Sequence, residues 1–400
     1  MAEYVLTLNA GSSSIKFGLF ASEPAGPRLL ASGQADGIGA DMWFLAKDPA
    51  GAVRAKWDLA DAARGDGHRQ AIAVILRWIE ESFPLSSIGA IGHRVVHGGP
   101  DFAGPVLLTG EVIARLEKLA PLAPLHQPHN LAGIAAAADA FPGAPQVACF
   151  DTAFHRGHPF VFDTFALPRR YYERGIRRYG FHGLSYEYIV RQMREIAPVA
   201  AAGRMIAAHL GNGASMCAIR NGRSLASTMG LSALDGLPMG TRCGQIDPGV
   251  LLYLLQEEGM PAGELAKLLY EESGLKGLSG ESQDMRDLEA SGSSASREAI
   301  AYLVSRIRHE LGGFAVNLSG LDAVVFSGGI GEHSARVRAA SLEGLEWLGI
   351  VLDPEANARH SQIITAPGSP VPVFIVPANE EAMIAVHTIE TAGLACAQGG

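Results

Sequence analysis

The chain has 400 residues, more than the ~250–300 at which one hydrophobic core stops growing, so we expect two domains. Hydrophobic residues make up 48% and charged residues 18%, which excludes a disordered chain. The 32 Lys and Arg against 41 Asp and Glu give a net charge of −9, which argues against nucleic-acid or membrane partners. Four scattered cysteines, and the lack of a long apolar run or a basic leader, predict a cytoplasmic protein.

The first elements in chain order are two strands joined by a tight turn. Residues 4–8 are apolar, 9–14 are rich in Gly and Ser, and apolar residues then alternate along 15–19, which predicts a β-hairpin. A similar order of apolar run, Gly-rich turn and second run returns at 205–219. This repetition suggests two halves of similar construction.

Helical and strand patterns alternate through the rest of the chain, which predicts the α/β class with helices covering mixed sheets. We expect helices over 71–81, 111–119, 249–256, 263–271, 296–316 and 380–391, and strands over 91–96, 146–150, 321–327 and 371–376. The boundary between the halves falls near 149–152, because the second hairpin lies well beyond it.

Neither a P-loop nor a dinucleotide fingerprint occurs, so a phosphate site would have to be built from several loops. The turn at 9–14 offers backbone N–H groups and hydroxyls, and Lys16 adds a positive charge, although a plain hairpin turn has the same composition. Arg94 follows an apolar stretch, and its guanidinium matches a carboxylate or a phosphate. We interpret its neighbours His93 and His97 as structural.

Further candidate residues lie where chain elements begin or end. Asp151 directly follows an apolar strand, a common place for a functional carboxylate, although an N-cap is the alternative. His182 and Arg242 lie in Gly-rich segments that ordinary surface loops would also explain, and Glu380 and Glu381 begin the last helix. Together these groups are the parts that phosphoryl transfer needs: anion loops, carboxylates for Mg²⁺ and fixed cations.

These motifs resemble the acetate kinase (acetokinase) family. The matching segments follow in order at 9–16, 92–99, 150–155, 179–183, 209–213, 239–242, 329–332 and 379–381. The resemblance implies two ribonuclease-H-like domains of the actin/Hsp70 type, with mixed sheets flanked by helices and an active site in the interdomain cleft. It also implies a homodimer that uses ATP or ADP with Mg²⁺ (or Mn²⁺) to convert acetate reversibly to acetyl phosphate.

The resemblance further assigns regions and residues. Residues 1–150 plus 384–400 would form an N-terminal, carboxylate-side domain, and 151–383 a C-terminal domain for nucleotide binding and dimerisation. Metal ligands would be Asn9 and Glu380; catalytic residues Asp151, His182 and Arg242; and substrate-binding residues Arg94, Val96, Leu125, Phe181 and Ala233. Nucleotide-binding residues would be Ser12, Ser14, Lys16, His209, Leu210, Gly211, Asn212, Gly213, Asp284, Met285, Arg286, Gly329, Ile330, Gly331, Glu332 and His333.

The matching position of Asp151 is usually regarded as an acid or base. Because acetate has a pKa of roughly 4–5, it is already ionised at neutral pH and offers no proton to abstract. We therefore favour a role for Asp151 in orienting Mg²⁺ or its water. Arg94 and Arg242, together with His182, would offset the repulsion between two anionic reactants.

Three positions depart from the family pattern. Ala233 stands where Pro is usual, which enlarges the small apolar pocket, so we expect propionate to be handled comparatively well. His333 stands where Asn is usual, which leaves the purine preference open, and Gln245 replaces a common acidic residue.

The closest alternative is a propionate kinase or a broad short-chain carboxylate kinase. An actin-like or Hsp70-like ATP-driven interaction protein would share the nucleotide loops, but it needs no site for an anionic acceptor of the kind that Arg94, His182 and Arg242 form. A sugar kinase would need polar residues to bind hydroxyls, whereas the expected pocket is apolar with one Arg.

Overall fold

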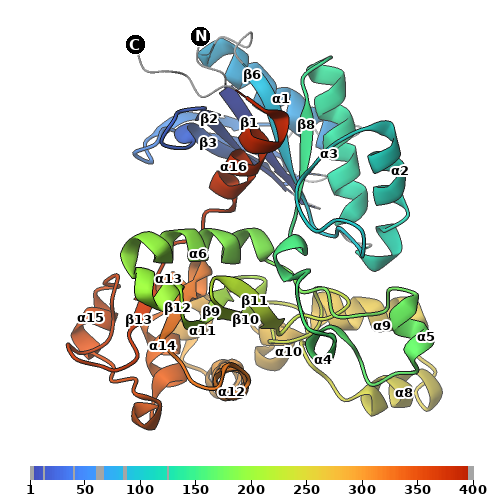
Figure 1. Cartoon of the computed structure of the whole chain (residues 1–400). Helices are drawn as coiled ribbons and strands as arrows, with labels where there is room; N and C mark the ends of the chain where they lie inside the picture. Colours follow the sequence, from blue (N-terminus) through green and yellow to red (C-terminus); the bar gives the residue numbers. More distant parts are fainter. Residues whose placement is uncertain are drawn as a thin grey trace. The chain divides into compact units, whose positions relative to one another are not determined.

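The computed structural model describes residues 4–11, 14–38, 41–59, 67–83, 88–123 and 126–394. The chain divides into two compact units, which Figure 1 colours along the sequence. Unit 1 comprises Met1–Phe154 and Asn379–Gly400, and unit 2 comprises His155–Ala378. These divisions lie a few residues from the expected boundaries, because the whole of the last helix belongs to unit 1. In the described part of the chain, no helix combines the length and apolar character that a membrane crossing requires.

Unit 1 is built on a mixed eight-stranded sheet. Its strands are β1 (Tyr4–Ala10), β2 (Ser14–Ala21), β3 (Arg28–Asp36), β4 (Trp43–Lys47), β5 (Val53–Asp58), β6 (Ile88–Val95), β7 (Val106–Leu107) and β8 (Gln146–Phe150). Its helices are α1 (Gly67–Ser82), α2 (Gly110–Glu117), α3 (Gln127–Ala140) and α16 (Glu380–Ala392), with a 3₁₀ turn at Ala120–Leu122. The strand order is β5-β4-β3-β2-β1-β6-β8-β7, in which β1, β6 and β8 are parallel and the other neighbours are antiparallel.

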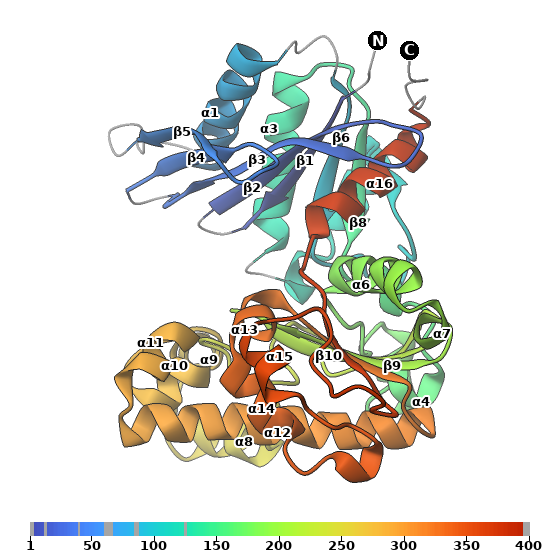
Figure 2. The same cartoon turned by 90° about the vertical axis from the view of Figure 1, so that its left-hand side faces the viewer.

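Helices cover both faces of this sheet (Figure 2). On one face α1 and α3 enclose an aromatic core, where the rings of Phe17 and Phe44 stack with centroids 6.0 Å apart and Trp78 packs against both. On the opposite face α16 packs through Ala385 against Val5 of β1. Because β1 is covered on both faces, its residues form a nearly continuous apolar run rather than an alternating one.

A glycine of β6 lets α16 pack closely on the sheet. A Cβ at Gly92 would overlap the hydroxyl of Thr388 and come within 2.6 Å of Cγ2 of Ile384. Both of those residues lie on α16. The close packing also determines where the first residue of the helix, Glu380, lies relative to β6.

Unit 2 is built on a mixed five-stranded sheet. Its strands are β9 (Arg204–Leu210), β10 (Ala214–Arg220), β11 (Arg223–Ser227), β12 (Ala323–Ser327) and β13 (Val373–Ile375). Its helices are α4 (Phe160–Asp163), α5 (Arg169–Glu173), α6 (Gly183–Ile196), α7 (Pro198–Ala201), α8 (Pro248–Gln256), α9 (Ala262–Lys267), α10 (Gly274–Ser279), α11 (Met285–Ser291), α12 (Ser294–Leu318), α13 (Gly328–His333), α14 (Ala335–Leu342) and α15 (Pro354–Ala358). A π-helical turn, Leu268–Glu272, follows α9, and 3₁₀ turns lie at Ala153–His155 and Glu346–Leu348.

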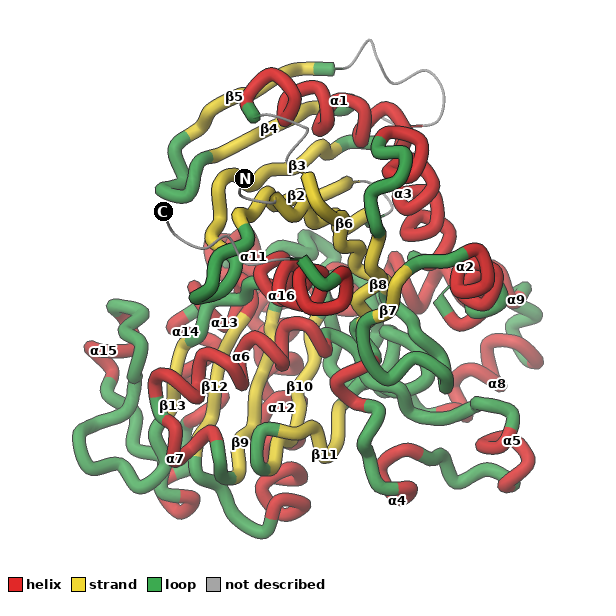
Figure 3. Tube along the Cα trace, turned by 45° about the horizontal axis from the view of Figure 1, so that its top comes forward, coloured by secondary structure: helices red, strands yellow, loops and turns green. Residues whose placement is uncertain are grey.

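The two sheets share one five-strand arrangement. In unit 2 the order is β11-β10-β9-β12-β13, with two antiparallel pairs followed by two parallel ones, and Figure 3 shows these strands side by side. Strands β3-β2-β1-β6-β8 of unit 1 repeat this order and these directions. Helix α6 lies along one face of the unit 2 sheet and α12 along the other (Figures 1 and 2). The predicted α/β class with two mixed sheets flanked by helices is therefore confirmed.

The predicted elements agree with the structure except in a few places. The helix expected over 263–271 is wrong in its second half, because α9 ends at Lys267 and a π-helical turn follows. Carbonyl groups of that turn accept hydrogen bonds from the 241–243 loop instead of continuing an α-helical ladder. Helices α3 and α6 and strands β3, β4 and β5 are among the elements that were not predicted. In α3 the run of alanines gives no contrast between an apolar and a polar face.

The packing of α16 on β6 gives a first prediction. Replacing Gly92 by Ala should lower the free energy of unfolding by about 1–3 kcal/mol, because the new methyl group forces α16 away from the sheet. Replacing Thr388 by Ala as well should restore part of that loss, since the overlapping hydroxyl is removed. The measurement is urea denaturation followed by circular dichroism.

Gly104→Ala is the matched control, because nothing lies within 4 Å of a Cβ at that position. A Gly92→Ala protein as stable as the control would contradict this description of the α16–β6 contact.

Candidate active site

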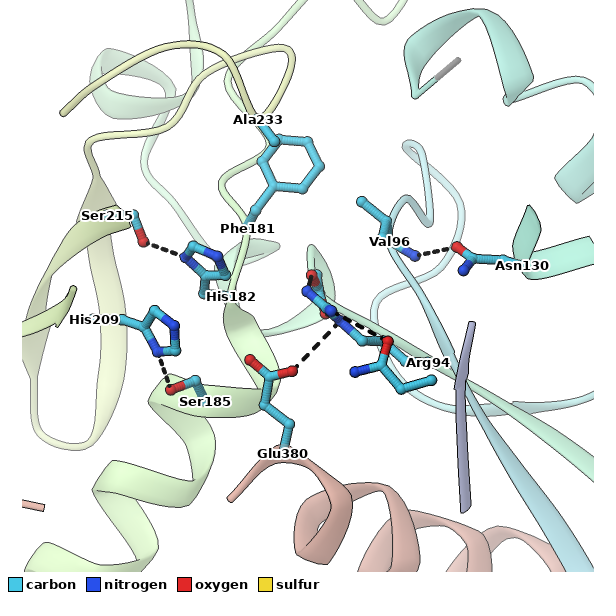
Figure 4. Close-up of polar contacts among 12 residues, drawn as sticks. Arg94, Val96, Asn130, Phe181, His182, Ser185, His209, Ser215, Ala233 and Glu380 are labelled. Atoms are coloured by element: carbon cyan, nitrogen blue, oxygen red, sulfur yellow. Dashed lines mark hydrogen bonds and ion pairs between the residues drawn. The ribbon is translucent and has the colours of Figure 1, made fainter. Parts of the chain in front are cut away.

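The guanidinium of Arg94 joins three other segments of unit 1. Its Nε and Nη2 donate to the two carboxylate oxygens of Asp151 at 2.9 and 2.6 Å, and its Nη1 donates to Oδ1 of Asn9 at 3.3 Å. Its Nε also lies 3.6 Å from Oε2 of Glu380 (Figure 4). Asn9 and Arg94 lie near the carboxyl ends of the parallel strands β1 and β6, and Asp151 directly follows β8. The parallel order therefore brings residues far apart in sequence to one edge of the sheet.

This group is half-buried and has an unbalanced charge. Burial alone would lower the pKa of Arg94, but the carboxylates of Asp151 and Glu380 beside it raise that pKa above its usual range, so the guanidinium stays charged. The side chain of Asp151 is only 1% exposed. With both carboxylates ionised, one positive charge faces two negative ones. Burial and the charge of Glu380 also raise the pKa of Glu381, the next residue of α16.

The donor atoms around Arg94 suit a hard divalent cation. Asn9 offers an amide oxygen, and Asp151 and Glu380 offer carboxylate oxygens. Mg²⁺ binds oxygen ligands, usually one or two carboxylates completed by water and phosphate oxygens. Within the described residues, no cluster of three or more His, Cys, Asp or Glu could hold an ion unaided. The net negative charge and the all-oxygen donor set therefore fit Mg²⁺ that shares its ligands with a substrate.

The turn between β1 and β2 carries the predicted phosphate residues. Lys16 lies opposite Asn9 in the hairpin register, and its charge acts on Glu381. Ser14 is the first residue of β2, and its carbonyl accepts from the N–H of Gly11 at 2.8 Å. Ser12 of the same turn, predicted to contact nucleotide phosphates, lies outside the described residues.

A buried asparagine that sequence analysis missed supports this edge of the sheet. Oδ1 of Asn130 accepts from the N–H of Val96 at 3.0 Å, and its Nδ2 donates to the carbonyl of Ala10 at 2.7 Å (Figure 4). Asn130 on α3 thus connects the last residue of β1 with the residue that follows β6. Val96, predicted to line the substrate pocket, is held by this bond, whereas Leu125 of the same prediction lies outside the described residues.

In unit 2, His182 lies in a network of histidine and hydroxyl groups. It precedes α6 with a left-handed backbone (φ 57°), and its Nδ1 lies 2.8 Å from the hydroxyl of Ser215, which also contacts the hydroxyl of Tyr186 at 2.5 Å. The ring of His209 stacks on that of His182 with centroids 4.4 Å apart, and its Nδ1 bonds Ser185 at 2.8 Å (Figure 4). The predicted residues His182 and His209 are therefore neighbours.

A second histidine fixes the backbone just before His182. Nε2 of His155 lies 2.9 Å from the carbonyl of Phe181, and because a carbonyl only accepts, this nitrogen carries the proton. Nδ1 of the neutral ring then accepts from the hydroxyl of Ser224 at 2.8 Å. Burial lowers the pKa of His155 to about 4, so this neutral form is maintained at neutral pH. The buried side chain of Phe181, a predicted pocket residue, is anchored in this way.

The loop that carries Arg242 is held by the segment that follows α9. Backbone groups of 239–243 pair with those of 268–276 at 2.8–3.1 Å. Gly274 adopts a left-handed conformation (φ 63°), and a Cβ there would overlap a carbonyl of the loop. Nη1 of Arg242 donates to the carbonyl of Ala233 at 3.1 Å. The structure therefore brings together a predicted catalytic residue and a predicted pocket residue.

A cavity of about 370 Å³ lies in unit 2 where the three predicted nucleotide segments meet. Eight predicted residues line it: Gly211, Asn212, Asp284, Met285, Arg286, Gly329, Ile330 and His333. Its lining does not include the predicted residues His209, Leu210, Gly213, Gly331 and Glu332. It does include Gln283, Glu289 and Ser334, which sequence analysis missed. The segments meet because β9 and β12 are parallel neighbours and their following loops leave the same sheet edge.

Two side chains of this cavity have clear local partners. Asp284 caps the amino terminus of α11 and pairs with Arg286 at 2.6 Å, and the hydrogen bonds from Arg286 lower the pKa of the Asp284 carboxyl. His333 is exposed, and its ring meets that of His360 edge-on with centroids 6.2 Å apart.

Comparison with known proteins agrees with these features. The sequence model of the acetokinase family matches residues 4–386. The acetate kinase of Methylocella silvestris is 56% identical, and the match covers 97% of this chain and 98% of that protein. The acetate kinase of Rhodopseudomonas palustris is 52% identical, and the match covers the same shares of the two chains. The crystal structure of Porphyromonas gingivalis acetate kinase is similar with a TM-score of 0.87 and 37% identity, covering 98% of this chain and 100% of its own. The crystal structure of a propionate kinase from Francisella tularensis is similar with a TM-score of 0.90 and 35% identity. The match covers 97% of this chain and 99% of that chain.

Proposed function

This chain belongs to the acetokinase family, and we propose on that premise that it catalyses the reversible phosphorylation of acetate by ATP to acetyl phosphate and ADP. The structural observation that carries the proposal is the half-buried guanidinium of Arg94 at the end of β6, which offers a carboxylate-binding group beside oxygen donors that fit Mg²⁺. The cavity of unit 2, lined by three loop segments, supports the nucleotide part of the proposal.

The proposed chemistry is a direct transfer of the terminal phosphoryl group. A carboxylate oxygen of acetate forms a bond to the γ-phosphorus, while the bond from that phosphorus to the β–γ bridging oxygen breaks and ADP leaves. Because acetate is already ionised at neutral pH, no proton has to move. Arg94 binds the acetate carboxylate, and Arg242 and His182 offset the negative charge that develops on the transferring group.

The other predicted residues have supporting roles in this proposal. Asp151 holds the Arg94 guanidinium in place through both of its carboxylate oxygens. Asn9 and Glu380 would hold Mg²⁺, which when bound neutralises part of the charge on the ATP phosphates. Lys16, together with Ser12 and Ser14, contacts the phosphates. The cavity-lining residues of the segments 209–213, 284–286 and 329–333 bind the nucleoside.

The first experiment asks whether the product is an acyl phosphate. With acetate, ATP, Mg²⁺ and hydroxylamine, the protein should form acetyl hydroxamate, which only an activated carboxylate yields.

Arg242→Ala should lower kcat by about 10³ or more, because it removes a cation from the transferring phosphoryl group. Arg169→Ala, which changes an arginine with a 74% exposed side chain, should leave kcat unchanged.

ATP hydrolysis without hydroxamate would contradict the proposal and favour an ATP-driven interaction protein. A near-normal kcat in Arg242→Ala would contradict the role given to that residue.

A second candidate, a kinase that also accepts propionate, is favoured by Ala233. The carbonyl of this residue is bonded to Arg242, but its side chain is a single methyl group where the family usually has a proline ring. Ala233→Pro should lower kcat/KM for propionate about 10-fold relative to acetate, since one methylene in a small pocket is worth ~1–3 kcal/mol. Measuring both substrates in the hydroxamate assay tests this, and an unchanged ratio would show that Ala233 does not set the pocket size.

We also propose that the protein is a homodimer that associates through α8. None of the nine residues of this helix is buried, although its sequence is almost entirely apolar. Val250, Leu252, Tyr253 and Leu255 are 42%, 53%, 56% and 39% exposed. Exposed apolar side chains gathered on one helix in this way are typical of a protein–protein interface.

Light scattering after size exclusion tests the dimer. The wild type should have twice the mass of one chain, and Leu252→Asp should have the mass of one chain. Val316→Asp is the control, because that residue is an exposed apolar side chain (76%) on another helix, α12. A monomeric wild type, or a Leu252→Asp protein that remains dimeric, would contradict the proposal.

A further inference from the structure

A fully buried arginine lies behind the nucleotide cavity of unit 2. Arg338 on α14 is 0% exposed, and among the described residues it forms no ion pair with a carboxylate. Burial lowers its pKa to about 10, so the guanidinium is still charged at neutral pH. A buried cation without a counter-charge is costly and needs complete hydrogen bonding.

The surroundings of Arg338 supply an acceptor for each of its five N–H groups. Nε donates to Oδ1 of Asn357 at 2.8 Å, and Nη1 donates to the carbonyls of Gly331 and Glu332 at 2.8 and 2.9 Å. Nη2 donates to the carbonyl of Asn357 at 2.9 Å and to Nδ1 of His360 at 3.0 Å. A lysine, with three donors on one nitrogen, could not satisfy this set.

Two of these bonds reach the wall of the cavity. Gly331 and Glu332 belong to α13, between the cavity-lining residues Ile330 and His333. A further partner of Arg338, His360, reaches the cavity indirectly, because its ring meets that of the lining residue His333 edge-on. Arg338 therefore connects the carboxyl end of α13 with the segment at 357–360, and it does so without lining the cavity itself.

We propose that Arg338 is a positioning residue for nucleotide binding, which fixes α13 so that Ile330 and His333 stay in place to receive the nucleoside. Asn357 and His360 accept the remaining hydrogen bonds of Arg338 and so hold its guanidinium in place. The inference rests on the proposed function, in that the ligand of the cavity is ATP or ADP.

Substitution of His360 offers a second way to test the hydrogen bonds of Arg338. Its Nδ1 accepts a hydrogen bond from Arg338, so this nitrogen carries no proton. His360 also has a left-handed backbone (φ 52°), a conformation that Asn tolerates better than most residues. The amide oxygen of an Asn side chain can replace Nδ1 as an acceptor, whereas Ala offers none. Because His360 is exposed, both variants are expected to fold.

The test is calorimetric titration of ADP, with KM for ATP and for acetate measured beside it. Arg338→Lys should raise the ADP Kd and the KM for ATP on the order of 10-fold, because α13 is displaced, while the KM for acetate changes less than about twofold. His360→Ala should weaken ADP binding in the same direction, and His360→Asn should restore it. Urea denaturation of each variant separates loss of binding from loss of stability.

Two controls match these changes. Arg220→Gln alters another arginine that donates to backbone carbonyls, those of Asn317 and Leu318 at the end of α12. Ile219→Ala alters a buried residue of β10 at the end of that strand away from the Gly211–Gly213 turn. Neither should change the ADP Kd, even though Ile219→Ala lowers stability.

The possible failures can be told apart. If the wild type binds no ADP, the proposed function is wrong and the inference falls with it. If the wild type binds ADP and Arg338→Lys binds it equally well, the inference alone is wrong. A rise in the acetate KM as large as that in the ATP KM would also overturn it, because it would indicate general disruption.

Discussion

The pairing of one half-buried arginine with two carboxylates is the constraint on which the rest of this account depends. Arg94 is bonded to Asn9 and to both oxygens of Asp151, and it lies beside Glu380, so four segments of unit 1 are held at one sheet edge. The group has more negative than positive charge, which attracts a cation and disfavours an unaccompanied anion. In a protein with a net charge of −9, an anionic substrate at this edge therefore needs positive charge in addition to the Arg94 guanidinium.

The five-strand arrangement shared by the two sheets explains why each unit gathers candidate site residues at the same sheet edge, with different residues in each unit. In both units the turn after the central strand and the chain after its parallel neighbour leave the sheet at the same edge. Unit 1 places Asn9 and Arg94 there, whereas unit 2 places the Gly-rich turns that line its cavity. Two glycines allow the close packing that positions the other predicted site residues. Gly92 lets α16, which begins at Glu380, pack on β6, and Gly274 lets the loop that carries Arg242 pack on the segment after α9.

Much of this could be read from the sequence, and what was missed has a common physical cause. The hairpins, the α/β class and the strand-end position of Asp151 follow from patterns along the chain. The assignment of the nucleotide segments followed from the family resemblance, and eight of their residues line one cavity. Asn130, His155 and Arg338 were missed because each acts by bonding backbone carbonyls or N–H groups outside its own helix or turn, those of Gly331, Glu332 and Asn357 in the case of Arg338. Such bonds leave no periodicity or spacing in the sequence.

A double-mutant cycle on Arg94 and Asp151 tests the central claim most directly. The quantity to measure is kcat/KM for acetate in Arg94→Gln, in Asp151→Asn and in the double variant. Because Asp151 acts here by holding Arg94, the account predicts that the double variant is little worse than Arg94→Gln, with a coupling energy of about 1 kcal/mol or more. Strictly additive losses would contradict the account, since they would mean that the two side chains act independently.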